Sequence, residues 1–119
     1  MARGAVQAIS AAGLTGVFIA GADADAANVN FVCQGKQTIE VLKDIQPLAK
    51  TAADVAKQLL DGGKPDAANT IALGGANIPV AAVRVEVVTP DTVKSLVVDT
   101  GFLSADELPA CKSRLASVK

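Results

Sequence analysis

The stretch that decides the fold is GVFIAGADADAANVNFVCQG, residues 16–35, in which an apolar run leads through a glycine into two aspartates. The run over 16–21 is short and bounded by glycines, which predicts a strand covered on both faces, as in a parallel sheet. Asp25 is a good N-cap, so we expect a helix over 26–34. One helix needs one cap, and the carboxylate of Asp23 is therefore left without a structural role.

The rest of the chain continues the alternation of strands and helices. In its first half we expect a helix over 5–12 that ends at Gly13, a strand over 38–43 and an amphipathic helix from about Pro47 that ends at Gly62. In its second half we expect a turn-rich stretch over 66–83, a strand over 82–88 and a helix that starts at Thr89 and Pro90. A turn over 104–108 and a short helix should follow. Short connections between strands and helices favour right-handed crossovers. The fold class predicted is α/β, a Rossmann-like layered parallel sheet flanked by helices.

Length and charge exclude several classes of protein. The chain has 119 residues, about the size of one domain, and 11 basic against 12 acidic residues give it a net charge of -1. Such a balance provides no attraction to nucleic acid or to anionic membranes. No apolar run approaches the roughly 20 residues of a membrane span. No basic and apolar leader follows Met1, so we expect no export signal within this sequence.

The cysteine and histidine content limits metal and cofactor chemistry. There is no histidine, and the two cysteines are Cys33 and Cys111, which is too few soft ligands for a zinc site. We expect neither a metal nor a cofactor. Two cysteines permit one disulfide or two separate thiols, and the sequence leaves both open.

An enzyme interpretation of the two aspartates meets several missing parts. An Asp-x-Asp pair after an apolar strand resembles the nucleophile loop of haloacid-dehalogenase-type phosphohydrolases. Ala27 stands where that loop has a hydroxyl residue, and no later lysine with an acidic pair completes a magnesium site. Histidine, the common general base, is absent. The sequence therefore argues against a phosphohydrolase, and we expect no enzyme.

Three longer segments resemble a binding protein instead. These are ARGAVQAISAAGL, FIAGADADAANVNFVCQGKQTIEVLKDIQPLAKTAADVAKQLLDGGKP and VRVEVVTPDTVKSLVVDTGFLSADEL. Together they resemble the C-terminal part of type I periplasmic sugar-binding proteins of ABC importers, closest to the xylose-type branch. The most specific pieces are Gly-x-Asp-Ala-Asp, the later Gln-Thr-x-x-x-x-Lys and the Asp-x-Gly-Phe-x-Ser tail. LacI-type regulators share the fold as the alternative, but usually carry a Gly-Phe-Asp-Asp loop.

The resemblance implies a sugar-binding role for two side chains. Asp23 matches the aspartate that accepts hydrogen bonds from sugar hydroxyls, and Lys43 matches a lysine that donates to sugar oxygens. An acceptor-only carboxylate suits a polyol, which offers several donors. Leu42 stands where the family often has an aromatic residue, which leaves the exact sugar open between a xylose-like pentose and a related aldose.

The resemblance also implies partners that lie outside this chain. We expect a single partial domain over 1–119, with the core strand–helix units of a C-terminal lobe over 1–65 and a crossover strand with a helical tail over 66–119. The partners implied are a monosaccharide, a missing N-terminal lobe and an ABC permease, in the periplasm and without nucleic acid. A lobe with uncovered strand edges is expected to form homo-oligomers, by edge pairing or by exchange of the segment after Pro65.

Overall fold

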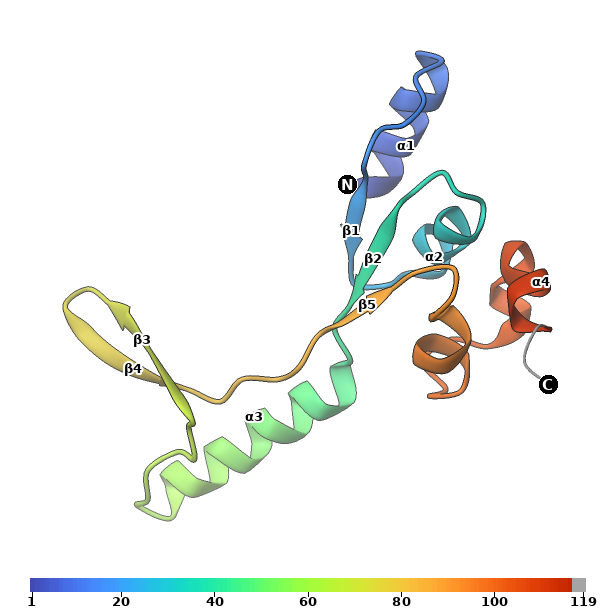
Figure 1. The fold of residues 1–119 in the computed structure, drawn as a ribbon. Helices are drawn as coiled ribbons and strands as arrows, with labels where there is room; N and C mark the ends of the chain where they lie inside the picture. Colours follow the sequence, from blue (N-terminus) through green and yellow to red (C-terminus); the bar gives the residue numbers. More distant parts are fainter. Residues whose placement is uncertain (117–119) are drawn as a thin grey trace. The chain divides into compact units, whose positions relative to one another are not determined.

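A computed structural model describes residues 1–116, which form two compact units (Figure 1). One unit contains Met1–Lys43 together with the chain from Val85 onward, and the other is Asp44–Arg84. The expectation of a single partial domain divided after residue 65 stays a prediction. Over residues 1–116, no helix has the length and apolar character needed to cross a membrane.

The first unit is built around a small sheet. Its elements are α1 (Ala2–Ala11), β1 (Ala20–Ala22), α2 (Ala26–Cys33), β2 (Ile39–Leu42), β5 (Glu86–Val88), the π-helix η1 (Lys94–Val98), the 3-10 helices η2 (Ala105–Glu107) and η3 (Pro109–Cys111), and α4 (Lys112–Leu115). The strand order is β1-β2-β5, with β1 and β2 parallel. The predicted α/β class is confirmed.

Two details of the predicted sheet are wrong. The strand β5 runs antiparallel to β2, with Leu42 opposite Glu86, because the chain leaves β2, passes through the other unit and returns without a crossover helix inside this unit. The strand β1 is shorter than predicted and is not covered on both faces, since Phe18 before it is 68% exposed. It is an edge strand, and β2 is the only strand of the described chain that pairs with it.

Small aliphatic side chains form most of the core. Its buried members are Ala24, Val29, Leu42, Val88, Val93, Val97, Leu108 and Cys111. Cys33 and Cys111 form a disulfide with a Cα–Cα distance of 5.2 Å, which resolves the alternative left open by the sequence. The disulfide fastens the end of α2 to η3 and so holds the C-terminal segment on the unit.

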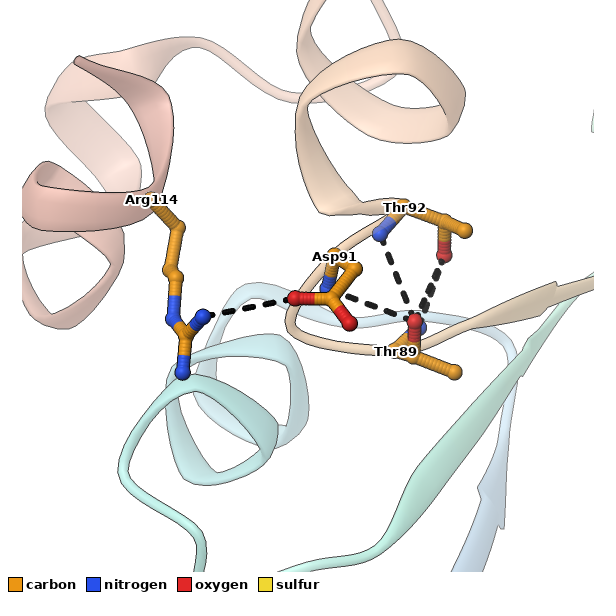
Figure 2. Close-up of polar contacts among 4 residues, drawn as sticks. All are labelled: Thr89, Asp91, Thr92 and Arg114. Atoms are coloured by element: carbon orange, nitrogen blue, oxygen red, sulfur yellow. Dashed lines mark hydrogen bonds and ion pairs between the residues drawn. The ribbon is translucent and has the colours of Figure 1, made fainter. Parts of the chain in front are cut away.

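Local hydrogen bonds shape the segment after β5 as the sequence predicted. Figure 2 shows the turn that leads into its helix, where the Thr89 hydroxyl accepts from the Thr92 amide at 3.3 Å and Asp91 pairs with Arg114 at 3.3 Å. The helical turns that follow are π-helical in η1. Further on, Glu107 Oε2 accepts from both the amide and the hydroxyl of Ser104 at 2.9 and 2.8 Å. This is the predicted turn over 104–108, and the short helix α4 follows it.

The second unit consists of the predicted helix and a hairpin that we did not predict. Helix α3 spans Ile45–Leu60, and Asp44 caps it by accepting from the Gln46 amide at 3.0 Å. The hairpin pairs β3 (Asn69–Leu73) with β4 (Ala76–Val80). Its turn is Gly74 and Gly75, with φ of 57° and 82°. A Gly-Gly pair tolerates these positive φ values and is a standard two-residue hairpin turn.

Candidate functional site

The two predicted sugar-binding side chains lie at the same edge of the sheet. Asp23 directly follows β1, and Lys43 directly follows β2. Because these strands are parallel and in register, with Ala22 opposite Val41, their carboxyl ends meet, and this is the usual location of ligands in open α/β sheets. Lys43 Nζ lies 2.6 Å from Asp23 Oδ1. The side chains are 50% and 72% exposed, so both remain accessible to a solute.

The backbone at Asp23 has an unusual conformation. Asp23 and Ala24 have φ of 84° and 53°, the only non-glycine residues with positive φ in the described chain. Such values are uncommon for side-chain-bearing residues and persist only where surrounding contacts enforce them. The Asp23 amide donates to Val41 O at 2.9 Å. The Ala24 amide donates to Glu40 Oε1 at 3.1 Å. Both amides of the turn are thereby fixed by the neighbouring strand.

Asp25 has the structural role that the sequence predicted. Its Oδ1 accepts from the Asn28 amide and its Oδ2 from the Asn28 side chain, both at 3.0 Å, at the first turn of α2. Both carboxylate oxygens therefore have partners. Of the two aspartates, Asp23 is the one whose carboxylate pairs only with an exposed lysine among the described contacts.

A hollow of about 380 Å³ lies beside this edge. It is lined by Met1, Ala2, Ala20, Gly21, Ala22, Asp23, Asp25 and Asn28. The volume is in the range of small-molecule sites. Lys43 is not part of this lining and adjoins it through the ion pair with Asp23. Within residues 1–116, no group of three or more metal-ligating side chains gathers here or elsewhere.

Three polar side chains beneath the site are buried, and the sequence did not predict their burial. They are Asn28, Gln37 and Glu40, at 5%, 2% and 0% exposure. Glu40 lies on the same buried side of β2 as Leu42, while Ile39 and Val41 are half-buried, so the strand shows no clear alternation of apolar and polar residues. Burial raises the pKa of Glu40, while hydrogen bonds from Gln37 and Ala24 act against that rise. The residue that could have indicated the burial of Glu40 is Gly21, which lies opposite Glu40 in the neighbouring strand.

Comparison with solved structures defines the class of protein. A carbohydrate transporter solute-binding protein from Chloroflexus aurantiacus, solved with D-glucose, matches with a TM-score of 0.81 and 33% identity over 91% of this chain and 33% of that one. An ABC transporter solute-binding protein from Clostridium phytofermentans, solved with β-D-glucose, matches with a TM-score of 0.77 and 27% identity over 90% of this chain and 34% of that one. The fold is that of a part of carbohydrate-binding proteins of ABC transporters.

Comparison of sequences gives relatives in the xylose-type branch of this class. The D-xylose-binding periplasmic protein of Escherichia coli is 40% identical over 108 residues, 90% of this chain and 33% of that protein. Its namesake in Haemophilus influenzae is 35% identical over the same length, 90% of this chain and 32% of that protein. No family model matches the chain. The resemblance to periplasmic sugar-binding proteins is confirmed, and the chain spans about a third of the length of the curated relatives it matches. The names of both relatives describe sugar binding.

Proposed function

We propose that this chain contributes one side of the sugar site in the substrate-binding component of a carbohydrate ABC importer, and that it is not an enzyme. The observation that carries the proposal is the exposed pair of Asp23 and Lys43, 2.6 Å apart at the adjacent carboxyl ends of the parallel strands β1 and β2. The ligand is a monosaccharide, a xylose-like pentose or a related aldose. The relatives named for D-xylose and the structures solved with glucose support this class of ligand.

The chemistry of the pair suits a sugar hydroxyl. An ionised carboxylate only accepts hydrogen bonds and an ammonium group only donates them, whereas a hydroxyl does both. A sugar hydroxyl can therefore donate to Asp23 while a neighbouring sugar oxygen accepts from Lys43. Both contacts are charge-assisted, which makes them stronger than bonds between neutral groups. In the absence of ligand the two side chains satisfy each other.

The proposed partners follow from the relatives. The remaining lobe of a two-lobed protein would supply the other contacts to the sugar, and an ABC permease in the membrane would receive it, with the complex in the periplasm. Because this chain holds only part of the hydrogen-bonding shell, we expect it to bind free sugar with a dissociation constant of about 1 mM or weaker.

Titration of the isotopically labelled chain with D-xylose and D-glucose, followed by NMR, tests the site. We expect the amide signals around Asp23 and Lys43 to shift at high sugar concentration, and Asp23→Ala to abolish the shift. The matched control is Asp54→Ala, which removes the exposed partner of Lys50 in a pair of the same 2.6 Å length on α3. Equal binding by Asp23→Ala and the unchanged chain would exclude this pair as the site, as would micromolar binding that leaves its signals unmoved.

We also propose that the chain associates with itself. Large apolar side chains are exposed in the second unit: Ile45, Leu48, Leu59, Leu60, Ile71, Leu73 and Ile78. Burying such surface gains roughly 25 cal/mol per Å². The routes are pairing of the open edge of β1 or exchange of the hairpin segment after Pro65 between two copies.

Light scattering at tens of micromolar protein checks this association. The expected mass exceeds the 11.9 kDa of one chain. Leu73→Lys, which replaces a 66% exposed side chain in β3, should weaken the association, while Lys64→Leu should not. A sample that shows only the monomer mass and unfolds cooperatively would contradict the proposal.

A further inference from the structure

Glu40 is buried at a position where the fold alone would favour an apolar residue. It lies in β2 two residues before Leu42, a member of the core, and is fully buried. No other carboxyl group of residues 1–116 is buried. Burying a carboxyl group is costly unless hydrogen bonds compensate for the lost water. A role beyond packing is therefore expected of this side chain.

The two carboxyl oxygens of Glu40 have separate partners. Oε1 accepts from the Ala24 amide at 3.1 Å, and Oε2 accepts from Gln37 Nε2. Gln37 Nε2 in turn donates to Ile39 O at 2.9 Å, which holds the amide group in place. Gln37 thus orients the carboxyl group of Glu40, which points at the Ala24 amide in the turn after β1.

The neighbouring strand leaves space for this arrangement. Gly21 lies opposite Glu40 in the β1–β2 register. A Cβ atom at Gly21 would lie 2.6 Å from Gln37 Nε2 and closer still to Glu40 Oε2. Both distances are too short for a side chain at this position unless Glu40 and Gln37 move. Glycine at this position therefore allows the buried carboxyl group to reach the turn beyond β1.

The turn that Glu40 reaches is the strained one. Ala24 is fully buried and has φ of 53°, next to Asp23 with φ of 84°. Without Glu40 the Ala24 amide would be a buried donor with no acceptor, which is a costly state. A different backbone conformation at Ala24 would then become favourable, and it would carry Asp23 away from Lys43.

We propose that Glu40 is a positioning residue of the candidate sugar site: its buried carboxyl group holds the left-handed turn at Asp23 and Ala24 and thereby fixes the Asp23 carboxylate beside Lys43. This inference rests on the proposed function. The groups that face Glu40 are Gln37 before β2, the Ala24 amide, and Asp25 and Asn28 at the start of α2. Asp25 is the titratable one among them, and its charge adds to the rise in the pKa of Glu40 that burial causes.

NMR without sugar tests the local part of the inference. In a pH titration, the Ala24 amide shift should follow the carboxyl carbon of Glu40, and Glu40→Gln should remove that transition. Glu107→Gln is the matched control, because Glu107 also accepts from a backbone amide, at Ser104, but in an exposed turn. An Ala24 shift that follows the Asp25 carboxyl carbon instead, or that persists in Glu40→Gln, would overturn the inference.

A second variant tests the conformation of the turn. In Glu40→Ala, the strong intraresidue HN–Hα NOEs that positive φ produces at Asp23 and Ala24 should weaken, while methyl signals of Val29 and Val97 report that the core is intact. In Glu40→Gln the NOEs should persist, since a glutamine oxygen can still accept from Ala24. If Glu40→Ala fails to fold, the pH response of Glu40→Gln decides the question.

Sugar titrations complete the test and separate the two proposals. At neutral pH, Glu40→Ala should bind D-xylose about tenfold more weakly than the unchanged chain, because an unpaired buried amide destabilises the bound arrangement. Glu40→Gln and Glu107→Gln should stay close to the unchanged chain. Sugar binding by Glu40→Ala at full strength would overturn this inference alone. No response of the unchanged chain to either sugar would overturn the proposed function itself.

Discussion

The two units of the chain both contain helices and strands but differ in burial. The first unit has a core of eight buried residues around its sheet. The second has no buried residue in α3, and every residue of β3 is exposed. Local signals such as a cap, a helical period and a glycine turn thus specify elements in both units, whereas a core needs several elements that share an apolar side. The difference predicts where substitutions matter.

The largest expected effect is loss of the disulfide in the first unit. Cys33 and Cys111 are separated by 78 residues, and opening a loop of that length releases chain entropy worth about 4 kcal/mol of stability. Reduction, or the double variant Cys33→Ala/Cys111→Ala, should lower the free energy of unfolding of this unit by about that amount in denaturant titrations.

The second unit serves as the internal control for this experiment. Its amide signals, from α3 and the hairpin, should be unchanged by reduction under native conditions, because no cysteine lies in it. Loss of the hairpin signals together with those of the core would show that the two units unfold as one and would break the comparison.

A matched pair of leucine truncations gives the next largest effect. Leu108 is fully buried in the first unit and Leu73 is 66% exposed in the second. Leu108→Ala should cost about 3 kcal/mol, from lost burial and the cavity that remains, whereas Leu73→Ala should stay within about 0.5 kcal/mol. Thermal unfolding of dilute samples measures both. Similar costs for the two variants would mean that Leu73 is buried in solution, for example against a second copy.

Features with a local cause were predictable from the sequence. The Asp25 cap, the amphipathic helix α3 and the turn at Ser104 depend on a few neighbouring residues, and the structure contains each. The closeness of Asp23 and Lys43 follows from their positions at the carboxyl ends of two adjacent parallel strands. The role of these two side chains in sugar binding stays a prediction.

Features that depend on distant or competing contacts were not predictable. The burial of Glu40 depends on the Ala24 amide, which leaves no mark in the sequence of β2, and on the space at Gly21, which becomes a signal only once the register of β1 and β2 is known. The direction of β5 depends on the path of the chain through the second unit. The hairpin was missed because the turn formers around it outweighed the Gly74–Gly75 signal.

The smallest expected effect is a pair of opposite pH dependences within the first unit, where buried and exposed glutamates can be compared directly. Burial raises the pKa of Glu40, while hydrogen bonds from the amide and hydroxyl of Ser104 lower the pKa of Glu107. The folded state therefore holds the Glu40 proton more tightly than the unfolded state, and the Glu107 proton less tightly.

The signs of the two contributions follow from linkage. The stability due to Glu40 is fully present below its unfolded pKa of about 4.5 and is lost as the pH rises through its raised folded pKa. The stability due to Glu107 is present above about 4.5 and is lost as the pH falls through its lowered folded pKa. Denaturant titrations between roughly pH 3 and pH 8 should show that Glu40→Gln removes the first slope and Glu107→Gln the second. Slopes of the same sign would mean that Glu40 is hydrated in solution, and the buried carboxyl group could then not hold the turn at Asp23.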